Sequence, residues 1–143
     1  MVALTSDRNT PRADGDLREG PVAAATTIFA GAYVMRDAAG NIVQGKTAAG
    51  LVGLGRAERR IDNSTGAAGD LTAYYRPGIY RYANSAAADE ITSADVGNLA
   101  YAVDDQTVAK TNGGATRSPA GIIDSVDTQG VWVRFDEALT NAS

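Results

Sequence analysis

The sequence predicts an all-β domain, a small β-barrel or β-sandwich, with an extended N-terminal arm. Short apolar segments rich in β-branched and aromatic residues recur from Pro21 onward, separated by Gly, Asn and Asp. Several of them alternate apolar and polar residues, as half-buried strands do. We find no convincing amphipathic helix and no internal repeat. Many short strands at such spacing are typical of barrels and sandwiches.

Residues 1–20 are predicted to form the arm, and residues 21–143 a single β domain. The arm is polar, with charges of alternating sign and no period of a strand or helix, yet it contains Val2, Leu4 and Leu17. Two interpretations remain open: a floppy terminus, or an arm that becomes ordered on a neighbouring subunit. For the second, the candidate contact residues are Leu4, Arg8, Arg12 and Leu17.

The first half of the β domain is expected to contain four strand segments. Residues 27–36 form an apolar strand, "DAAGN" at 37–41 is a turn, and "IVQG" returns. Residues 49–63 begin Gly-rich and suit a bent strand, followed by a loop over 63–70. Residues 71–84 hold four of the six tyrosines and predict a strand, a kink or turn at Pro77-Gly78, and another strand.

The stretch from Ile91 to Lys110 predicts a β-hairpin. "TSAD" at 92–95 has the pattern of a helix N-cap, but the glycine at 97 allows only one turn. Leu99, Tyr101 and Val103 alternate with alanines, as in a strand. Residues 107–111 supply the return strand. Asp104, Asp105 and Gln106 then lie in the connection, where aspartate caps nearby backbone N–H groups.

The segment 117–135 closes the domain. Residues 127–130 form a turn. In the strand that follows, Val131, Val133 and Phe135 share one face, whereas Trp132 and Arg134 share the other.

Composition excludes several classes of function. The net charge of −4 repels phosphates and argues against direct nucleic-acid binding. The chain has no cysteine or histidine, which removes disulfides, thiolate nucleophiles, ordinary zinc sites and the Ser-His-Asp triad. No membrane span and no signal peptide are expected, so we expect synthesis in the cytoplasm. Alanine supplies much of the 44% hydrophobic content, and such a thin core favours a partner surface or oligomerisation.

Sequence motifs that would indicate catalysis or the binding of a nucleotide, phosphate or metal are weak. "GLVGLG" at 50–55 lacks the dinucleotide spacing, and its glycines are interpreted as permitting strand bending or close backbone approach. "NGGATRSPAG" at 112–121 lacks a phosphate-loop lysine, and no calcium-loop spacing occurs. A glycosidase needs only two carboxylates, but 17 acids on a small domain are ordinarily solvated surface. We therefore predict no enzyme, metal or cofactor. The carboxylates that such an enzyme would use are Glu58, Asp104, Asp105, Asp124 and Asp127.

Aromatic and arginine residues are the candidates for a contact surface. Eleven of the 13 basic residues are arginine, the better interface cation because of its planar donor fork. Tyrosine, tryptophan and arginine concentrate at interface hot spots, although core packing explains strand tyrosines equally simply. The candidates in the β domain are Tyr74, Tyr75, Arg76, Tyr80, Tyr82, Trp132 and Arg134.

Residues 60–135 carry a combination of motifs that resembles a known family. They are "GAAGD" at 66–70, "ITSADVG" at 91–97, "YAVDDQTV" at 101–108, "RSPAG" at 117–121 and "GVWV" at 130–133. Together they resemble the capsid decoration, or cement, proteins of tailed bacteriophages and prophages. The likeness covers a little over half of the chain and adds a looser match around "AGAYVMRD".

This resemblance implies a non-enzymatic β-barrel or β-sandwich on the outer surface of a phage head. Such a protein binds the major capsid protein, bridges capsomers and acts as a dimer or trimer. The thin core, and tyrosines that cannot all face inward, predict a homo-oligomer, with a dimer slightly favoured over a trimer. The family offers no catalytic or ligand residues to carry over. Two alternatives from other classes stay open: a carbohydrate-binding or adhesin-like β module that uses the Tyr/Trp surface, and a glycosidase with a carboxylate pair.

Overall fold

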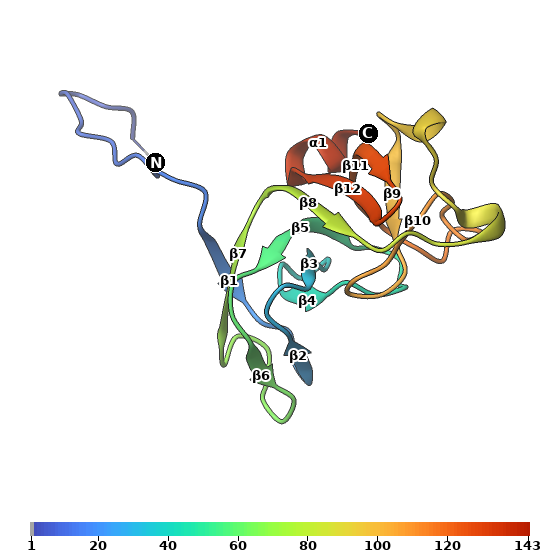
Figure 1. Cartoon of the computed structure of the whole chain (residues 1–143). Helices are drawn as coiled ribbons and strands as arrows, with labels where there is room; N and C mark the ends of the chain where they lie inside the picture. The colour runs from blue at the N-terminus through green and yellow to red at the C-terminus, as the bar shows by residue number, and fades with distance from the viewer. Residues whose placement is uncertain (1) are drawn as a thin grey trace.

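The structure is a computed structural model that describes residues 2–143, and it confirms the all-β prediction (Figure 1). The strands form two five-stranded antiparallel sheets and one two-stranded sheet. In spatial order, the first sheet contains β1 (Arg18–Pro21), β7 (Thr72–Arg76), β5 (Val52–Ala57), β3 (Tyr33–Arg36) and β4 (Ile42–Gln44). The second contains β10 (Val108–Ala109), β9 (Leu99–Ala102), β11 (Pro119–Asp127), β12 (Gly130–Phe135) and β8 (Gly78–Tyr82). The small sheet pairs β2 (Thr26–Ile28) with β6 (Ile61–Asn63).

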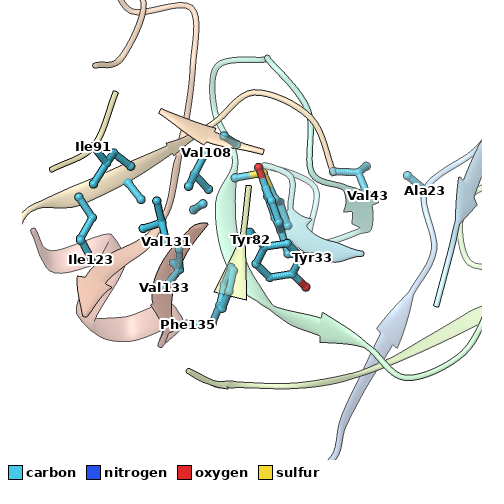
Figure 2. Close-up of a cluster of buried hydrophobic side chains, with 14 residues drawn as sticks. Ala23, Tyr33, Val43, Tyr82, Ile91, Val108, Ile123, Val131, Val133 and Phe135 are labelled. Carbon is cyan, nitrogen blue, oxygen red and sulfur yellow. The ribbon is translucent and has the colours of Figure 1, made fainter. Parts of the chain in front are cut away.

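The main hydrophobic core lies between the two large sheets, which gives a sandwich-like arrangement and, within residues 2–143, no closed barrel. Figure 2 shows its aromatic centre, where Tyr33 of β3 meets Tyr82 of β8 edge-on with ring centroids 5.0 Å apart. Phe135 of β12 completes the group at 5.7 Å from each ring. The Tyr33 hydroxyl donates a hydrogen bond of 2.7 Å to the Thr107 carbonyl. These contacts join strands that are far apart in the sequence.

A second core cluster covers the other face of the first sheet. Its members include Ile28 of β2, Val34 of β3, Ile42 of β4 and Leu54 of β5. Val34 lies in this cluster whereas its neighbours in β3 belong to the main core, so β3 is buried on both faces. This explains why the segment that contains β3 is apolar without alternation. The small β2–β6 sheet therefore covers the first sheet on the side away from the second sheet.

The chain crosses from the first sheet to the second at Pro77. β7 pairs with β1 and β5, and the next strand, β8, pairs with β12. The predicted kink is therefore the point where the chain changes sheets. Tyr75 before it and Tyr82 after it both face inward, because the alternation of buried positions restarts at the crossing.

Glycine permits a close backbone approach at β5, as the sequence predicted. A Cβ atom on Gly53 would lie 1.7 Å from the carbonyl oxygen of Ala120 in β11. On Gly55 it would lie 2.3 Å from the carbonyl oxygen of Arg76, next to the crossing. Neither contact is sterically possible, so a side chain at Gly53 would push β5 away from β11 of the second sheet, and one at Gly55 would push it away from β7 within the first sheet.

The β9–β10 hairpin is confirmed, with Val108 paired to Ala102. Thr92 and Asp95 form the predicted capping box at a single 3₁₀ turn, η2 (Ser93–Asp95). The other short turn of this type is η1 (Ala87–Asp89). The face assignment of β12 also holds, because Val131, Val133 and Phe135 are buried.

Four details differ from the sequence interpretation. Residues 49–63 hold two strands in different sheets, β5 and β6, rather than one bent strand. Residues 27–36 hold parts of two strands, because the connection 29–32 separates β2 from β3. The last residues of the predicted arm, from Arg18, enter the first sheet as β1. A short helix not predicted from the sequence, α1 (Glu137–Ala142), follows β12, and the Asp136 side chain caps it by accepting a hydrogen bond from the Leu139 backbone N–H. Within the described residues, no helix is long and apolar enough to cross a membrane.

Candidate interaction surface

The N-terminal arm is the most exposed part of the described chain. Figure 1 shows it projecting from the body beyond β1. All four predicted contact residues in the arm, Leu4, Arg8, Arg12 and Leu17, are exposed. The exposed fractions of Val2 and Leu4 are 88% and 72%. Two aliphatic side chains thus lie in water on a segment with no core of its own.

The root of the arm is fastened to the body. Gly15 adopts a φ of +75°, and the Arg18 guanidinium donates hydrogen bonds to the carbonyl oxygens of Gly15 and Leu17 at 2.9 and 3.1 Å. Asp16 forms an ion pair with Arg76 of β7. The direction in which the arm leaves the body is therefore set by local bonds and one ion pair.

Arg76 belongs to a row of charges that we call the root cluster: Asp16, Arg56, Glu58 and Arg76. Arg56 Nη2 lies 2.9 Å from the Glu58 carboxylate, and Arg76 Nε lies 3.5 Å from it. The hydrogen bond from Arg56 is the main cause that lowers the pKa of Glu58. In the order Asp16, Arg76, Glu58 and Arg56, negative and positive charges alternate, so each charge has a neighbour of opposite sign.

Arginines lie over two half-buried aromatic rings of this surface. The Arg59 guanidinium lies 4.3 Å from the centroid of the Tyr74 ring, and that of Arg56 lies 4.5 Å from the Tyr80 ring. Cation–π contact at such distances stabilises a ring that would otherwise lie in water. Tyr74 and Tyr80 are half-buried, so both retain surface for a partner.

Trp132 and Arg134 lie on the outer face of β12, as predicted. The Trp132 indole donates a hydrogen bond of 2.9 Å to Asp127, and the Arg81 guanidinium lies 5.6 Å from its ring centroid. Arg134 is exposed. These residues and the root cluster are therefore both accessible from solvent.

Two of the predicted contact residues are placed differently by the structure. Tyr75 and Tyr82 are only 6% and 8% exposed. The Tyr82 hydroxyl donates a hydrogen bond of 2.7 Å to the Gly31 carbonyl, and burial raises its pKa. The Tyr75 hydroxyl accepts a hydrogen bond of 3.2 Å from Arg36. Because β7 and β8 bury these side chains, we leave both out of the proposed contact surface.

The carboxylates that a glycosidase would need are dispersed over several elements. Asp124 is exposed on β11, and Asp127 lies in the β11–β12 turn, where the hydrogen bond from Trp132 is the main cause that lowers its pKa. Glu58 is held in the root cluster. Within residues 2–143, no group of three or more acids is placed to hold a metal ion.

Asp104 and Asp105 occupy the connection between β9 and β10. Asp104 accepts a hydrogen bond of 2.9 Å from the Gln106 backbone N–H, which is the turn-capping role expected from the sequence. Asp105 is half-buried, and burial, with Asp104 as a second cause, raises its pKa. Its backbone carbonyl accepts a hydrogen bond of 3.1 Å from the Tyr33 N–H. The hairpin tip is therefore tied to β3 in the first sheet.

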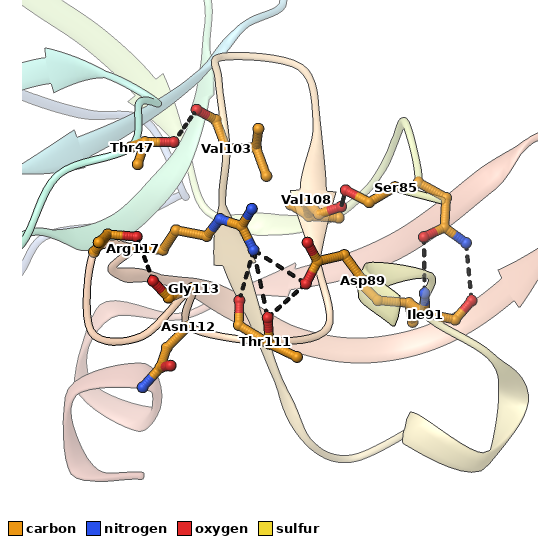
Figure 3. Close-up of polar contacts among 12 residues, drawn as sticks. Thr47, Ser85, Asp89, Ile91, Val103, Val108, Thr111, Asn112, Gly113 and Arg117 are labelled. Atoms are coloured by element: carbon orange, nitrogen blue, oxygen red, sulfur yellow. Dashed lines mark hydrogen bonds and ion pairs between the residues drawn. The ribbon is translucent and has the colours of Figure 1, made fainter. Parts of the chain in front are cut away.

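Arg117 makes a polar contact that the sequence did not reveal. Figure 3 shows its guanidinium between Asp89 and Thr111. Arg117 Nη1 lies 3.2 Å from the Asp89 carboxylate and 3.1 Å from the Thr111 carbonyl oxygen. Hydrogen bonds from Thr111 and Arg117 lower the pKa of Asp89. This network joins the 83–98 connection to the loop before β11.

The sequence interpretation missed Phe29, Arg56 and Arg59. Phe29 is 52% exposed in the β2–β3 connection and lies under Arg60. The "RAERR" run at 56–60, at the end of a Gly-rich strand, was the available signal for the arginines.

Comparison of the chain with protein-family models, with curated proteins and with solved structures produced no match in any of the three.

Proposed function

We propose that this protein is a structural decoration protein that binds the outside of a bacteriophage head and stabilises contacts between capsomers. Its partners are the major capsid protein and further copies of itself. In this proposal the mature protein is part of the virion surface, after synthesis in the host cytoplasm. The motif resemblance and the exposed arm support the proposal independently of each other.

The arm is the observation that carries the proposal. A segment with exposed Val2 and Leu4 buries too little apolar surface to order alone, but a groove on a partner would cover these side chains. The bonds at Gly15, Asp16 and Arg18 hold the arm's origin in place. A fixed origin followed by a long exposed segment suits a protein that grips a neighbouring subunit.

The motifs behind the resemblance have structural roles in this fold. The capping box forms η2, the two aspartates close the β9–β10 hairpin, and Arg117 binds Asp89. "GVWV" opens β12 of the second sheet. The resemblance therefore supports a shared β scaffold more directly than a shared binding surface.

The test is co-sedimentation with shells assembled from the major capsid protein that this proposal names as the partner. The full chain should saturate the shells at a fixed ratio to the capsid subunit, and a chain that lacks residues 1–17 should bind far more weakly. Val96→Ala is the matched control, because Val96 is an exposed apolar residue directly after η2 rather than on the arm. No saturable binding of the full chain would overturn the proposal.

Self-association has a separate test. Sedimentation equilibrium at micromolar concentration should show a homo-oligomer, with the dimer favoured over the trimer. A monodisperse monomer of high melting temperature would remove self-assembly from the proposal while leaving shell binding to the first experiment.

A further inference from the structure

A pocket of about 620 Å³ lies where four connections meet, and no residue of the root cluster lines it. They are the β2–β3 connection, the end of β8, the β9–β10 hairpin and the β11–β12 turn. We propose that this pocket binds a neutral saccharide unit. The residues we assign to it are Phe29, Gly31, Arg81, Asp105, Gln106 and Gln129.

The framework of the pocket is held by bonds between these connections. The Tyr82 hydroxyl binds the Gly31 carbonyl at 2.7 Å, and the Ala83 N–H binds the Gln106 carbonyl at 2.8 Å. The Arg81 guanidinium donates a hydrogen bond of 2.6 Å to the Gln129 side chain. The walls are thus preformed, as a site for a small ligand requires.

The chemistry of the lining favours a hydroxylated, uncharged ligand. Asp105 supplies carboxylate acceptors, Arg81 supplies donors, and the Gln106 and Gln129 amides supply both. No other residue between positions 2 and 143 donates a hydrogen bond to the Asp105 carboxylate, which is half-buried. One positive and one negative side chain balance each other, so the site does not select for an anion.

Phe29 supplies an apolar surface at the edge of the pocket. Its ring is exposed on a short connection where no core packing requires an aromatic residue. An aromatic ring beside hydrogen-bonding groups suits a sugar, which has C–H groups on one face and hydroxyls at its rim. The site differs from the Tyr/Trp surface that the sequence suggested for carbohydrate.

The experiment is an NMR titration of the isolated, isotope-labelled full chain with methyl glycosides of neutral hexoses and N-acetylhexosamines. We expect saturable shifts confined to residues 29–32, 81–83, 105–106 and 129 for at least one glycoside. A Kd of the order of 1 mM is reasonable for so small a ligand in an open pocket. Inorganic phosphate, as the anionic probe, should bind more weakly than that glycoside.

Two matched variants make the test specific. Phe29→Ala should weaken binding about tenfold or more, and Tyr74→Ala should leave it unchanged. Both rings are surface aromatics under an arginine, but only Phe29 lines the pocket. Asp105→Ala should also weaken binding about tenfold, because charge-assisted hydrogen bonds are lost.

Three results would overturn the inference: no shifts with any glycoside, preferential binding of phosphate, or equal losses in Phe29→Ala and Tyr74→Ala. The titration needs no capsid shell. Its outcome is therefore independent of whether the protein decorates a phage head.

Discussion

Removal of the arm should separate the stability of the domain from its binding to a shell. Deletion of residues 1–17 removes the hydrogen bonds that the exposed Arg18 guanidinium donates to the carbonyl oxygens of Gly15 and Leu17. It also breaks the ion pair between Asp16 and Arg76. Both side chains are partly exposed, at 59% and 37%, so solvent screens the pair and its loss costs at most about 1 kcal/mol. The melting temperature should fall by no more than about 5 °C. Shell binding should nevertheless fall strongly.

Deletion of residues 1–21 is the informative comparison. It also removes β1, whose register pairs Arg18 with Tyr75 and Pro21 with Thr72. This deletion loses about two hydrogen bonds between β1 and β7, at about 1 kcal/mol each. It also partly exposes Ile42, at about 1 kcal/mol. The free energy of unfolding should therefore fall by roughly 3 kcal/mol. Urea denaturation followed by circular dichroism measures both variants.

The reasoning fails if the shorter deletion costs as much stability as the longer one, since the arm would then pack on the body. It also fails if the chain without residues 1–17 decorates shells as tightly as the full chain. In that case the arm is a passive tail, and the contact surface moves to Tyr74, Arg76 and Trp132. Because the arm carries charges of both signs, added salt should weaken part of the binding.

Three further predictions concern the body of the domain. Gly53→Ala should destabilise the domain by about 1–3 kcal/mol or more in urea denaturation, because the new Cβ meets the Ala120 backbone. Gly20→Ala is the control and should cost less, because its new Cβ meets only the end of the Ile42 side chain. Asp105→Asn should raise the melting temperature at pH 7 but not below about pH 3.9. The pKa of Asp105 is higher in the folded chain than in the unfolded chain. The wild-type chain therefore loses stability as the pH rises from the unfolded-state pKa through the folded-state pKa. Thr140→Val should increase the free energy of unfolding, because the Thr140 hydroxyl is buried with no hydrogen-bond partner in residues 2–143; a loss of stability would show that the hydroxyl is satisfied.

Local patterns predicted the elements whose structure depends on local interactions. The β9–β10 connection and the turn at 92–95 depend on aspartate side chains that bind backbone N–H groups two or three residues away. The inward face of β12 follows from simple alternation over 131–135. For Gly53 the sequence indicated a close approach, but only the fold shows that Ala120 is the neighbour.

The faces of the tyrosine-rich strands could not be predicted from alternation. Odd positions such as Tyr75 face inward before Pro77, and even positions such as Tyr82 face inward after it. The change occurs because the chain moves from one sheet to the other, which is a tertiary event with no local signal. The sequence therefore identified the tyrosines as a group without separating the buried Tyr75 and Tyr82 from the half-buried Tyr74 and Tyr80, of which Tyr80 packs against the main core.

Asp105 connects the stability of the fold with the pocket. Its position in the hairpin requires only the backbone carbonyl that binds Tyr33 and a residue compatible with the turn, and asparagine satisfies both requirements. A half-buried carboxylate that is disfavoured at neutral pH therefore costs stability without improving the hairpin. Such a cost is typical of side chains held in place for binding. If Asp105→Asn stabilises the domain and also weakens glycoside binding, the two measurements together assign the carboxylate to the ligand rather than to the turn.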